Sequence, residues 1–198
     1  KYAHAICWFV PDVLDEEVIS SLPNLRVLAG FGRGYDNIDV RAATLRNIWV
    51  TVGPETMVDP VADLTWGLIL SVARRVAVGD RYVRATKLSG WHPTRCLGYP
   101  VSRKNLGIIG MGKLGRAIAR RASGFEMNLY YCETGPVDKA AERELQLKRT
   151  TLEDLLRKSD FICIATPLTE ETYHLISARE LSLMKPSAIL VNTARGSE

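Results

Sequence analysis

The sequence has few of the residues that cross-link a small protein or bind a metal. Its 198 residues include four cysteines and three histidines. The cysteines lie 89, 36 and 31 residues apart, with no Cys-x-x-Cys pair and no histidine pair nearby. This spacing excludes a disulfide framework and the usual zinc sites. We expect a reduced, cytoplasmic protein without a metal, in which Cys7 and Cys163 are small buried thiols within apolar runs.

Long hydrophobic runs and a strong charge of one sign are also missing. The most apolar stretch, 64–78, contains Arg74 and Arg75 and falls short of the roughly 20 apolar residues that cross a bilayer. The N-terminus does not resemble a signal peptide. The formal charge of +4 is dispersed along the chain. We expect no membrane or nucleic-acid partner, and a small anionic substrate would suit the mild positive charge.

The composition is that of a folded globular protein. Hydrophobic residues make up 46% of the chain and charged residues 24%, and a chain of this length can bury roughly 70% of its unfolded surface. An apolar run follows almost directly after Lys1, and another ends just before Glu198. Because both ends look cut, we expect an internal fragment of a longer protein.

Short apolar runs alternate with helical patterns, which predicts βαβ units. The fold class expected is α/β, with a doubly wound parallel sheet. Two sequences have capping-box spacing, Thr150 to Glu153 and Ser177 to Glu180. The predicted strands are 6–10, 26–29, 48–52, 106–109, 128–132, 161–165 and 189–192.

The alternating pattern is interrupted twice, and this suggests three regions. Residues 1–58 are expected to be part of one α/β unit, and 100–198 most of a second. Between them, 59–99 combines one long helix, running to residue 78, with an irregular arm. The helix is apolar almost all round, which suits burial between domains or subunits or within a core.

The strongest motif is the glycine-rich sequence Gly110-Met111-Gly112-Lys113-Leu114-Gly115, which follows a predicted strand and opens a helix. Its glycines allow a tight turn, close approach to a pyrophosphate, and close packing of helix on strand. Glu133 ends the next strand, where it would bind the adenosine ribose and repel a 2′-phosphate. No cation follows in Thr134-Gly135-Pro136, so NAD is favoured over NADP. The cofactor-binding residues predicted here are Gly110, Gly112, Lys113, Leu114, Gly115 and Glu133.

Further polar segments follow other predicted strands. Ligands of an open parallel sheet bind outside the carboxyl ends of its strands, where Thr166, Pro167, Thr193 and Ala194 are expected beside the cofactor. Arg195 follows the last strand, while Arg33 and Gly34 follow a strand of the first unit. We expect both arginines near one crevice, as two fixed positive charges for an anionic substrate.

These motifs occur in the order typical of one family. Over essentially its whole length the chain resembles the NAD-dependent D-isomer-specific 2-hydroxyacid dehydrogenases. The resemblance implies a Rossmann-like NAD-binding domain at 100–198, part of a flavodoxin-like substrate domain at 1–58, and a homodimer built on the helix and arm of 59–99. It also implies that Arg195 is the catalytic arginine, and that the catalytic His and its Glu partner lie beyond residue 198. We therefore expect this fragment alone to be inactive. The segments that carry the resemblance are 34–39, 61–63, 110–115, 167–172 and 191–196.

Within the family, the likeness is strongest to the phosphonate dehydrogenases, which oxidise phosphite to phosphate. Arg33 stands before Gly34, where those enzymes carry a cation, and 90–93 resembles their arm. One departure from the family is Glu126, which replaces a glycine and is expected to affect packing only. Two alternatives stay open: a D-2-hydroxyacid dehydrogenase acting as a glyoxylate or hydroxypyruvate reductase, and a non-catalytic NAD-sensing corepressor.

Overall fold

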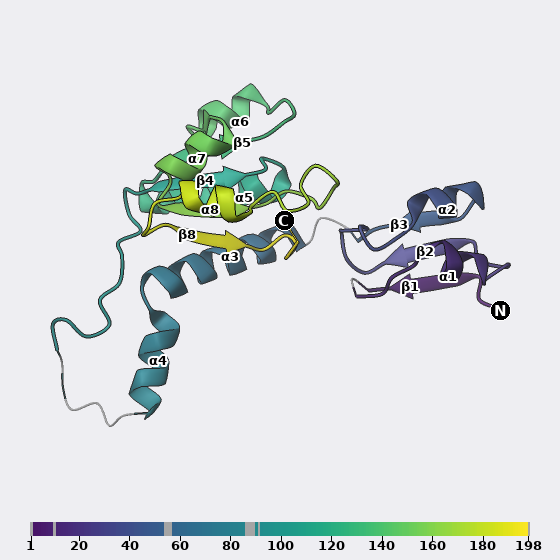
Figure 1. Ribbon diagram of the computed structural model, residues 1–198, viewed down its shortest axis with the longest axis horizontal. Coiled ribbons are helices and arrows are strands. Elements are labelled where there is room, and N and C mark those ends of the chain that lie inside the picture. The colour runs from purple at the N-terminus through teal and green to yellow at the C-terminus, as the bar shows by residue number, and fades with distance from the viewer. Residues whose placement is uncertain (1, 10, 54–56, 86–89, 91, 198) are drawn as a thin grey trace. The chain divides into compact units, whose positions relative to one another are not determined.

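The computed structural model describes residues 2–9, 11–53, 57–85, 90 and 92–197. The chain divides into two compact units, Lys1–Met57 and Val58–Glu198 (Figure 1). Both are α/β with parallel sheets, which confirms the predicted fold class. No helix in the described ranges is both long and apolar enough to cross a membrane.

The first unit is a parallel sheet of three strands in the order β1-β2-β3. One face carries a core in which Trp8, Leu28 and Ile19 are buried, under the two helices. Asp15 and Asp39 cap these helices by accepting the amide hydrogens of Val18 and Ala42. The elements are β1 (Ala5–Trp8), α1 (Glu16–Ser20), β2 (Val27–Gly30), α2 (Val40–Leu45) and β3 (Trp49–Thr51).

The two cysteines expected to be buried differ. Cys163 is fully buried, and burial raises the pKa of its thiol to about 12. Cys7 is exposed, so that expectation is wrong. Successive side chains of a strand point to opposite faces, and Trp8 takes the face that packs on the helices. Cys7 therefore points to the other face of β1.

The second unit holds a parallel sheet of five strands in the order β6-β5-β4-β7-β8. The chain moves outward from β4 to β6, then returns to the other side of β4 for β7. Strand order therefore reverses between β4 and β7. The strands are β4 (Asn105–Ile109), β5 (Asn128–Cys132), β6 (Lys148–Arg149), β7 (Phe161–Ile164) and β8 (Ile189–Asn192). The helices are α3 (Val58–Ala73), α4 (Val76–Ala85), α5 (Lys113–Ala122), the short 3-10 helix η2 (Ser123–Phe125), α6 (Lys139–Glu144), α7 (Leu152–Lys158) and α8 (Ala178–Leu183).

Helices cover both faces of this sheet. Ile108 of β4 and Cys163 of β7 belong to the core that α3 and α5 complete. The next residue along each of these strands, Ile109 and Ile164, packs with Leu155 of α7 on the opposite face. Strands buried on both faces are continuously apolar, which is why the sequence predicted them well.

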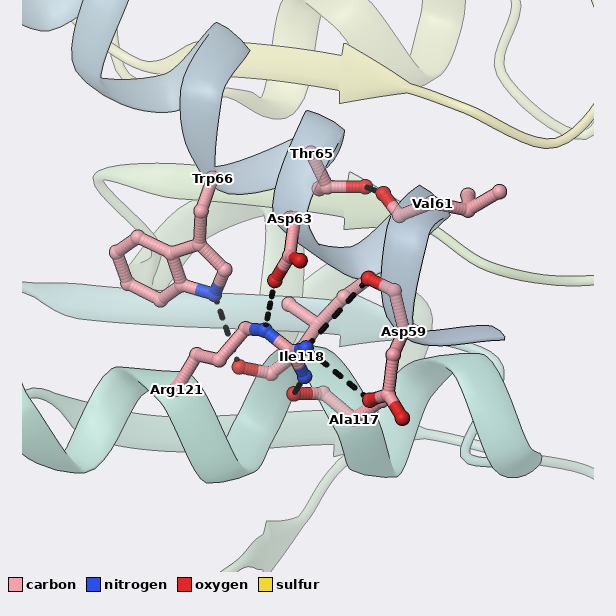
Figure 2. Close-up of polar contacts among 8 residues, drawn as sticks. All are labelled: Asp59, Val61, Asp63, Thr65, Trp66, Ala117, Ile118 and Arg121. Carbon is pink, nitrogen blue, oxygen red and sulfur yellow. Dashed lines mark hydrogen bonds and ion pairs between the residues drawn. The ribbon is translucent and has the colours of Figure 1, made fainter. Parts of the chain in front are cut away.

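Polar contacts fix α3 against α5 (Figure 2). The Arg121 guanidinium donates to Asp63 at 2.7 Å and to Asp59 at 3.1 Å, so one side chain of α5 bridges two carboxylates of α3. The indole of Trp66 donates to the carbonyl of Ile118 at 3.0 Å and stacks on Phe125. These contacts hold α3 on the sheet of the second unit.

The long helix expected over 59–78 is broken. α3 ends at Ala73, and Arg75 adopts a left-handed conformation with φ 57° before α4 begins. The carbonyl of Ala73, which would accept from the next helical turn, accepts instead from the amide of Tyr99 at 2.8 Å. A Cβ on Gly98 would lie 2.3 Å from the same carbonyl. The break therefore depends on a segment some 25 residues away, which local helical periodicity does not report.

The cap of α7 and the strand β6 also differ from the prediction. The capping box at Ser177 and Glu180 is present, but α7 is capped by Thr151, which accepts the amide of Asp154, and not by Thr150. Thr150 instead donates its amide to Tyr131 and extends the pairing of β6 with β5. The strand β6 was not predicted, because two exposed basic residues carry no apolar alternation.

Glu126 ends η2 in a left-handed conformation, with φ 53° and ψ 38°. A side chain there costs about 1 kcal/mol relative to glycine, because its Cβ approaches the following carbonyl. The carboxylate forms a 2.9 Å ion pair with Arg103, and both side chains are largely exposed. Exposed pairs contribute little, so the conformational cost outweighs the ion pair.

We predict that Glu126→Gly raises the free energy of unfolding by about 0.5–1 kcal/mol, because glycine relieves the left-handed backbone. Urea denaturation followed by circular dichroism measures the change. Glu126→Ala is the matched control: it removes the ion pair but keeps the strain, so it should be neutral or slightly destabilising. Equal stabilisation by both substitutions would contradict the role of the backbone.

Candidate nucleotide-binding site

The glycine-rich turn joins β4 to α5 through two close approaches of backbone to backbone. Gly110 has φ +91°, and a Cβ there would lie 2.8 Å from the carbonyl oxygen of Ala165. A Cβ on Gly115 would lie 2.1 Å from the carbonyl oxygen of Gly110. Only glycine fits either position, so β4, α5 and the end of β7 meet without intervening side chains. The N-terminus of α5 is thereby fixed at the carboxyl edge of the sheet.

Gly112 differs from its neighbours because its Cβ position is open. It is the N-cap of α5, and apart from its two chain neighbours no described residue has an atom within 4 Å of a Cβ built there. Its φ of −71° is ordinary, so the backbone does not require glycine. The first turn of a helix presents unpaired amide hydrogens and the positive end of the dipole. The open space lies where a diphosphate would meet them.

Glu133 follows β5 and reaches the glycine-rich turn. One carboxylate oxygen accepts the amide hydrogen of Met111 at 2.9 Å, and the other accepts those of Thr134 and Gly135. Burial alone would raise the pKa of this carboxyl, but the three amide hydrogen bonds lower it below its ordinary value. Glu133 is therefore a carboxylate at neutral pH, held beside the turn.

Thr166 is the first residue of the loop after β7 that faces this turn. Its amide nitrogen would lie 2.9 Å from a Cβ on Gly110. Its hydroxyl oxygen is buried and finds no hydrogen-bond partner in the described part of the chain. A buried, unpaired hydroxyl is costly, and it indicates a position that a polar group of a ligand would satisfy. Pro167 follows on the surface, where its carbonyl accepts the Thr172 hydroxyl at 2.7 Å.

The loop after β8 carries Arg195 and is attached to α3. The hydroxyls of Thr193 and Thr65, which is fully buried in α3, are 2.9 Å apart. Asn192 closes the loop by accepting the amide of Ala194 and donating to the carbonyl of Arg195. The half-buried Arg195 donates to the carbonyl of Ala194 at 3.0 Å. The sequence interpretation missed Thr65, whose apolar neighbours in the helix hid its role.

The structure brings most of the predicted cofactor residues to one edge. The ends of β4, β5, β7 and β8 lie there because all five strands are parallel. The side chain of Leu114 packs against the core, while Lys113 is exposed. Met111, whose amide binds Glu133, was not predicted.

The residues of the first unit form a separate loop after β2. The amide of Gly53 donates to the carbonyl of Gly32 at 2.7 Å, which ties this loop to the end of β3. Arg33 is exposed, Gly34 is half-buried, and the rings of Phe31 and Phe9 lie 5.3 Å apart. The expected convergence of Arg33 with Arg195 joins the two units and stays a prediction.

These observations fit a dinucleotide. The edge offers the N-terminus of α5, the open space at Gly112, a carboxylate at the end of β5 and the Thr166 hydroxyl, which has no hydrogen-bond partner among the described residues. The strand order also reverses beside β4, which is where ligands of doubly wound sheets bind.

Comparison with known proteins agrees with this geometry. Residues 66–198 match the family described as D-isomer specific 2-hydroxyacid dehydrogenase, NAD binding domain. The chain is 48% identical to a glyoxylate reductase of Pyrococcus horikoshii, over 99% of this chain and 60% of that protein. It is similar to a solved structure of Aquifex aeolicus D-lactate dehydrogenase complexed with NAD and lactic acid, with 33% identity, a TM-score of 0.90, and 100% and 58% of the chains covered.

A Thermus thermophilus structure gives a TM-score of 0.92 at 38% identity, over 100% of this chain and 61% of that one. The chain thus spans about 60% of the length of the relatives it matches. NAD as the cofactor is confirmed by the matched NAD-binding domain.

The expected phosphonate dehydrogenase is wrong. Curated relatives from Pyrococcus, Thermococcus and Aeropyrum are all named glyoxylate reductase. The physical reason is that one cation before Gly34 does not distinguish phosphite from other small anions, since a guanidinium binds carboxylate and phosphorus oxyanions alike. The matched NAD-binding domain, together with the geometry of the sheet edge, places this chain in the D-isomer specific 2-hydroxyacid dehydrogenase family.

Proposed function

We propose that this chain belongs to an NAD-dependent glyoxylate reductase, an oxidoreductase that acts on a small 2-keto acid such as glyoxylate or hydroxypyruvate. The observation that supports this most directly is the 48% identity to the Pyrococcus horikoshii enzyme over nearly the whole chain. The glycine-rich turn, Glu133 and Thr166 supply the fitting cofactor site. A reducing cytoplasm suits the four free cysteines.

Each group at the sheet edge has a role in this proposal. The amides at the start of α5 bind the diphosphate, and Glu133 accepts hydrogen bonds from the adenosine ribose. Thr166, Pro167, Thr193 and Ala194 line the approach to the nicotinamide. When bound, the cofactor supplies the hydride that the 2-keto acid accepts.

Arg195 is proposed to orient and polarise the substrate. A guanidinium binds a carboxylate through two parallel hydrogen bonds and stabilises negative charge that develops on the carbonyl oxygen. Its loop is held by Thr65 and Asn192, which limits the movement of the guanidinium. Arg33, in the loop after β2, is proposed as a further anion-binding residue.

The activity is tested with the full-length protein by following NADH oxidation at 340 nm with glyoxylate, hydroxypyruvate and pyruvate. We expect glyoxylate to have the highest kcat/KM. A protein that binds NADH yet turns over none of the three acids would contradict the proposed function.

Arg195→Met should lower kcat with glyoxylate by about 100-fold or more, the usual loss when a charge that stabilises the transition state is removed. NADH affinity should change little, because Arg195 faces the substrate. Arg157→Met, which removes an exposed arginine in α7, is the matched control and should leave both quantities unchanged. Equal losses in the two variants would contradict the assignment.

Gly112→Ala tests the cofactor site separately from folding. The new methyl group enters open space, so stability should change by about 1 kcal/mol or less, but NADH should bind at least about tenfold more weakly because the diphosphate is kept from the amides. Gly124→Ala is the control, since its Cβ position is also open among the described residues. Calorimetric titration with NADH measures the affinity of both variants. Unchanged affinity in Gly112→Ala would contradict the diphosphate site.

We also propose a homodimer that buries the outer face of α3. Leu64, Leu68 and Val72 recur every four residues and are 56%, 37% and 56% exposed. This spacing forms one apolar stripe on a helix whose opposite face is buried.

Leu68→Glu should therefore convert the dimer to monomers at micromolar concentration, because a carboxylate cannot be buried unpaired in an apolar interface. Sedimentation velocity measures the change. Leu181→Glu, which changes a half-exposed leucine of α8, is the control, and this variant should stay dimeric. A wild-type protein that sediments as a monomer would contradict the proposal.

A further inference from the structure

A cation lies beside the segment 133–135, called here the Glu133 loop, although the sequence has none at 134–136. Arg149 lies on β6, directly opposite Tyr131 of β5. One terminal nitrogen of its guanidinium donates to the carbonyl of Glu133 at 2.6 Å and to that of Gly135 at 3.0 Å. The same nitrogen lies 3.5 Å from the carbonyl of Thr134. Arg149 therefore holds the three-residue segment that presents the ribose-binding carboxylate.

The Arg149 charge is not neutralised by these contacts. Carbonyl oxygens carry no net charge, and the side chain is exposed at the edge of the sheet. The thiol of Cys132 lies close enough to Glu133 and Arg149 for its pKa to depend on both. Burial raises the pKa of Cys132, the Glu133 charge raises it further, and the Arg149 charge lowers it. A carboxylate and a guanidinium thus act on the same end of β5.

The two charges have opposite effects on a 2′-phosphate. The Glu133 carboxylate, fixed by the Met111 amide at 2.9 Å, repels a phosphate dianion on the ribose that it would bind. A guanidinium is the side chain best shaped to bind such a phosphate. Both groups are held by the same short segment, 133–135.

We propose that Arg149 is the second determinant of the NAD/NADP choice: it positions the Glu133 loop for NAD, and it becomes the ligand of a 2′-phosphate once the Glu133 charge is removed. This inference rests on the proposed nucleotide site. It explains how a chain with no cation at 134–136 can carry one for that position, brought in by strand pairing from β6.

The test measures binding of two probes, ADP-ribose and ADP-ribose 2′-phosphate, to the protein by isothermal titration calorimetry. Neither probe needs turnover. The variants are Glu133→Gln, Arg149→Met and the double substitution. Glutamine can still accept from the Met111 amide, so Glu133→Gln removes the charge but not the contact. Lys148→Met is the matched control, because Lys148 is the other exposed cation of β6 and lies over the Tyr130 ring.

We expect the wild type to prefer ADP-ribose. Glu133→Gln should bind the 2′-phosphate at least about tenfold more tightly than the wild type does, and the double variant should lose that gain. Arg149→Met alone should weaken ADP-ribose binding by about threefold to tenfold, since the loop loses its two carbonyl contacts. Lys148→Met should change neither affinity.

Arg149→Lys in the Glu133→Gln background keeps the charge and should keep most of the gain, which guards against a folding defect in Arg149→Met. A gain that persists in the double variant would overturn the role of Arg149 while leaving the nucleotide site intact. Failure of the wild type to bind either probe would overturn the nucleotide site itself, and this inference with it.

Discussion

The second unit depends on backbone segments that lie so close together that a side chain between them would keep them apart. At Gly110 the turn after β4 lies against the carbonyl of Ala165, and at Gly115 the first turn of α5 lies against the carbonyl of Gly110. These contacts fix where α5 begins relative to the sheet. Because that helix end is fixed, one edge of the sheet holds the open position at Gly112, the carboxylate of Glu133 and the Thr166 hydroxyl.

The helix α3 extends this arrangement along the same face of the sheet toward β8. Its inner face is bound to α5 by Arg121 and Trp66, and Thr65 reaches the loop that carries Arg195. A helix that lies outside the βαβ pattern thus connects α5 to the loop that carries Arg195. Movement of α3 would therefore displace both α5 and the loop that carries Arg195.

Local sequence predicted the features that depend on neighbouring residues. The strands at 128–132 and 189–192 have the expected bounds, because an apolar run marks each of them, 129–132 in the first and 189–191 in the second. The glycine-rich turn and Glu133 were predicted from the spacing of one motif, and at Gly110 and Gly115 the backbone contacts leave room for glycine alone. The same reasoning failed where the cause is distant: the helix breaks at Arg75 because Tyr99 takes a carbonyl, and Arg149 reaches the Glu133 loop through strand pairing. The phosphite interpretation failed for a different reason, since a cation specifies charge but not the identity of an anion.

The position of Gly112 has a consequence for divergence among related enzymes. The donors around it belong to the main chain, so their presence does not depend on which side chains occupy the turn, provided that Gly110 and Gly115 keep the backbone in place. On the proposed roles of Glu133 and Arg149, preference between dinucleotides would lie instead in side chains at the end of β5 and on β6. Retention of a cofactor and choice of a cofactor are thus separately mutable, and a lineage can change the second by a few substitutions without rebuilding the first.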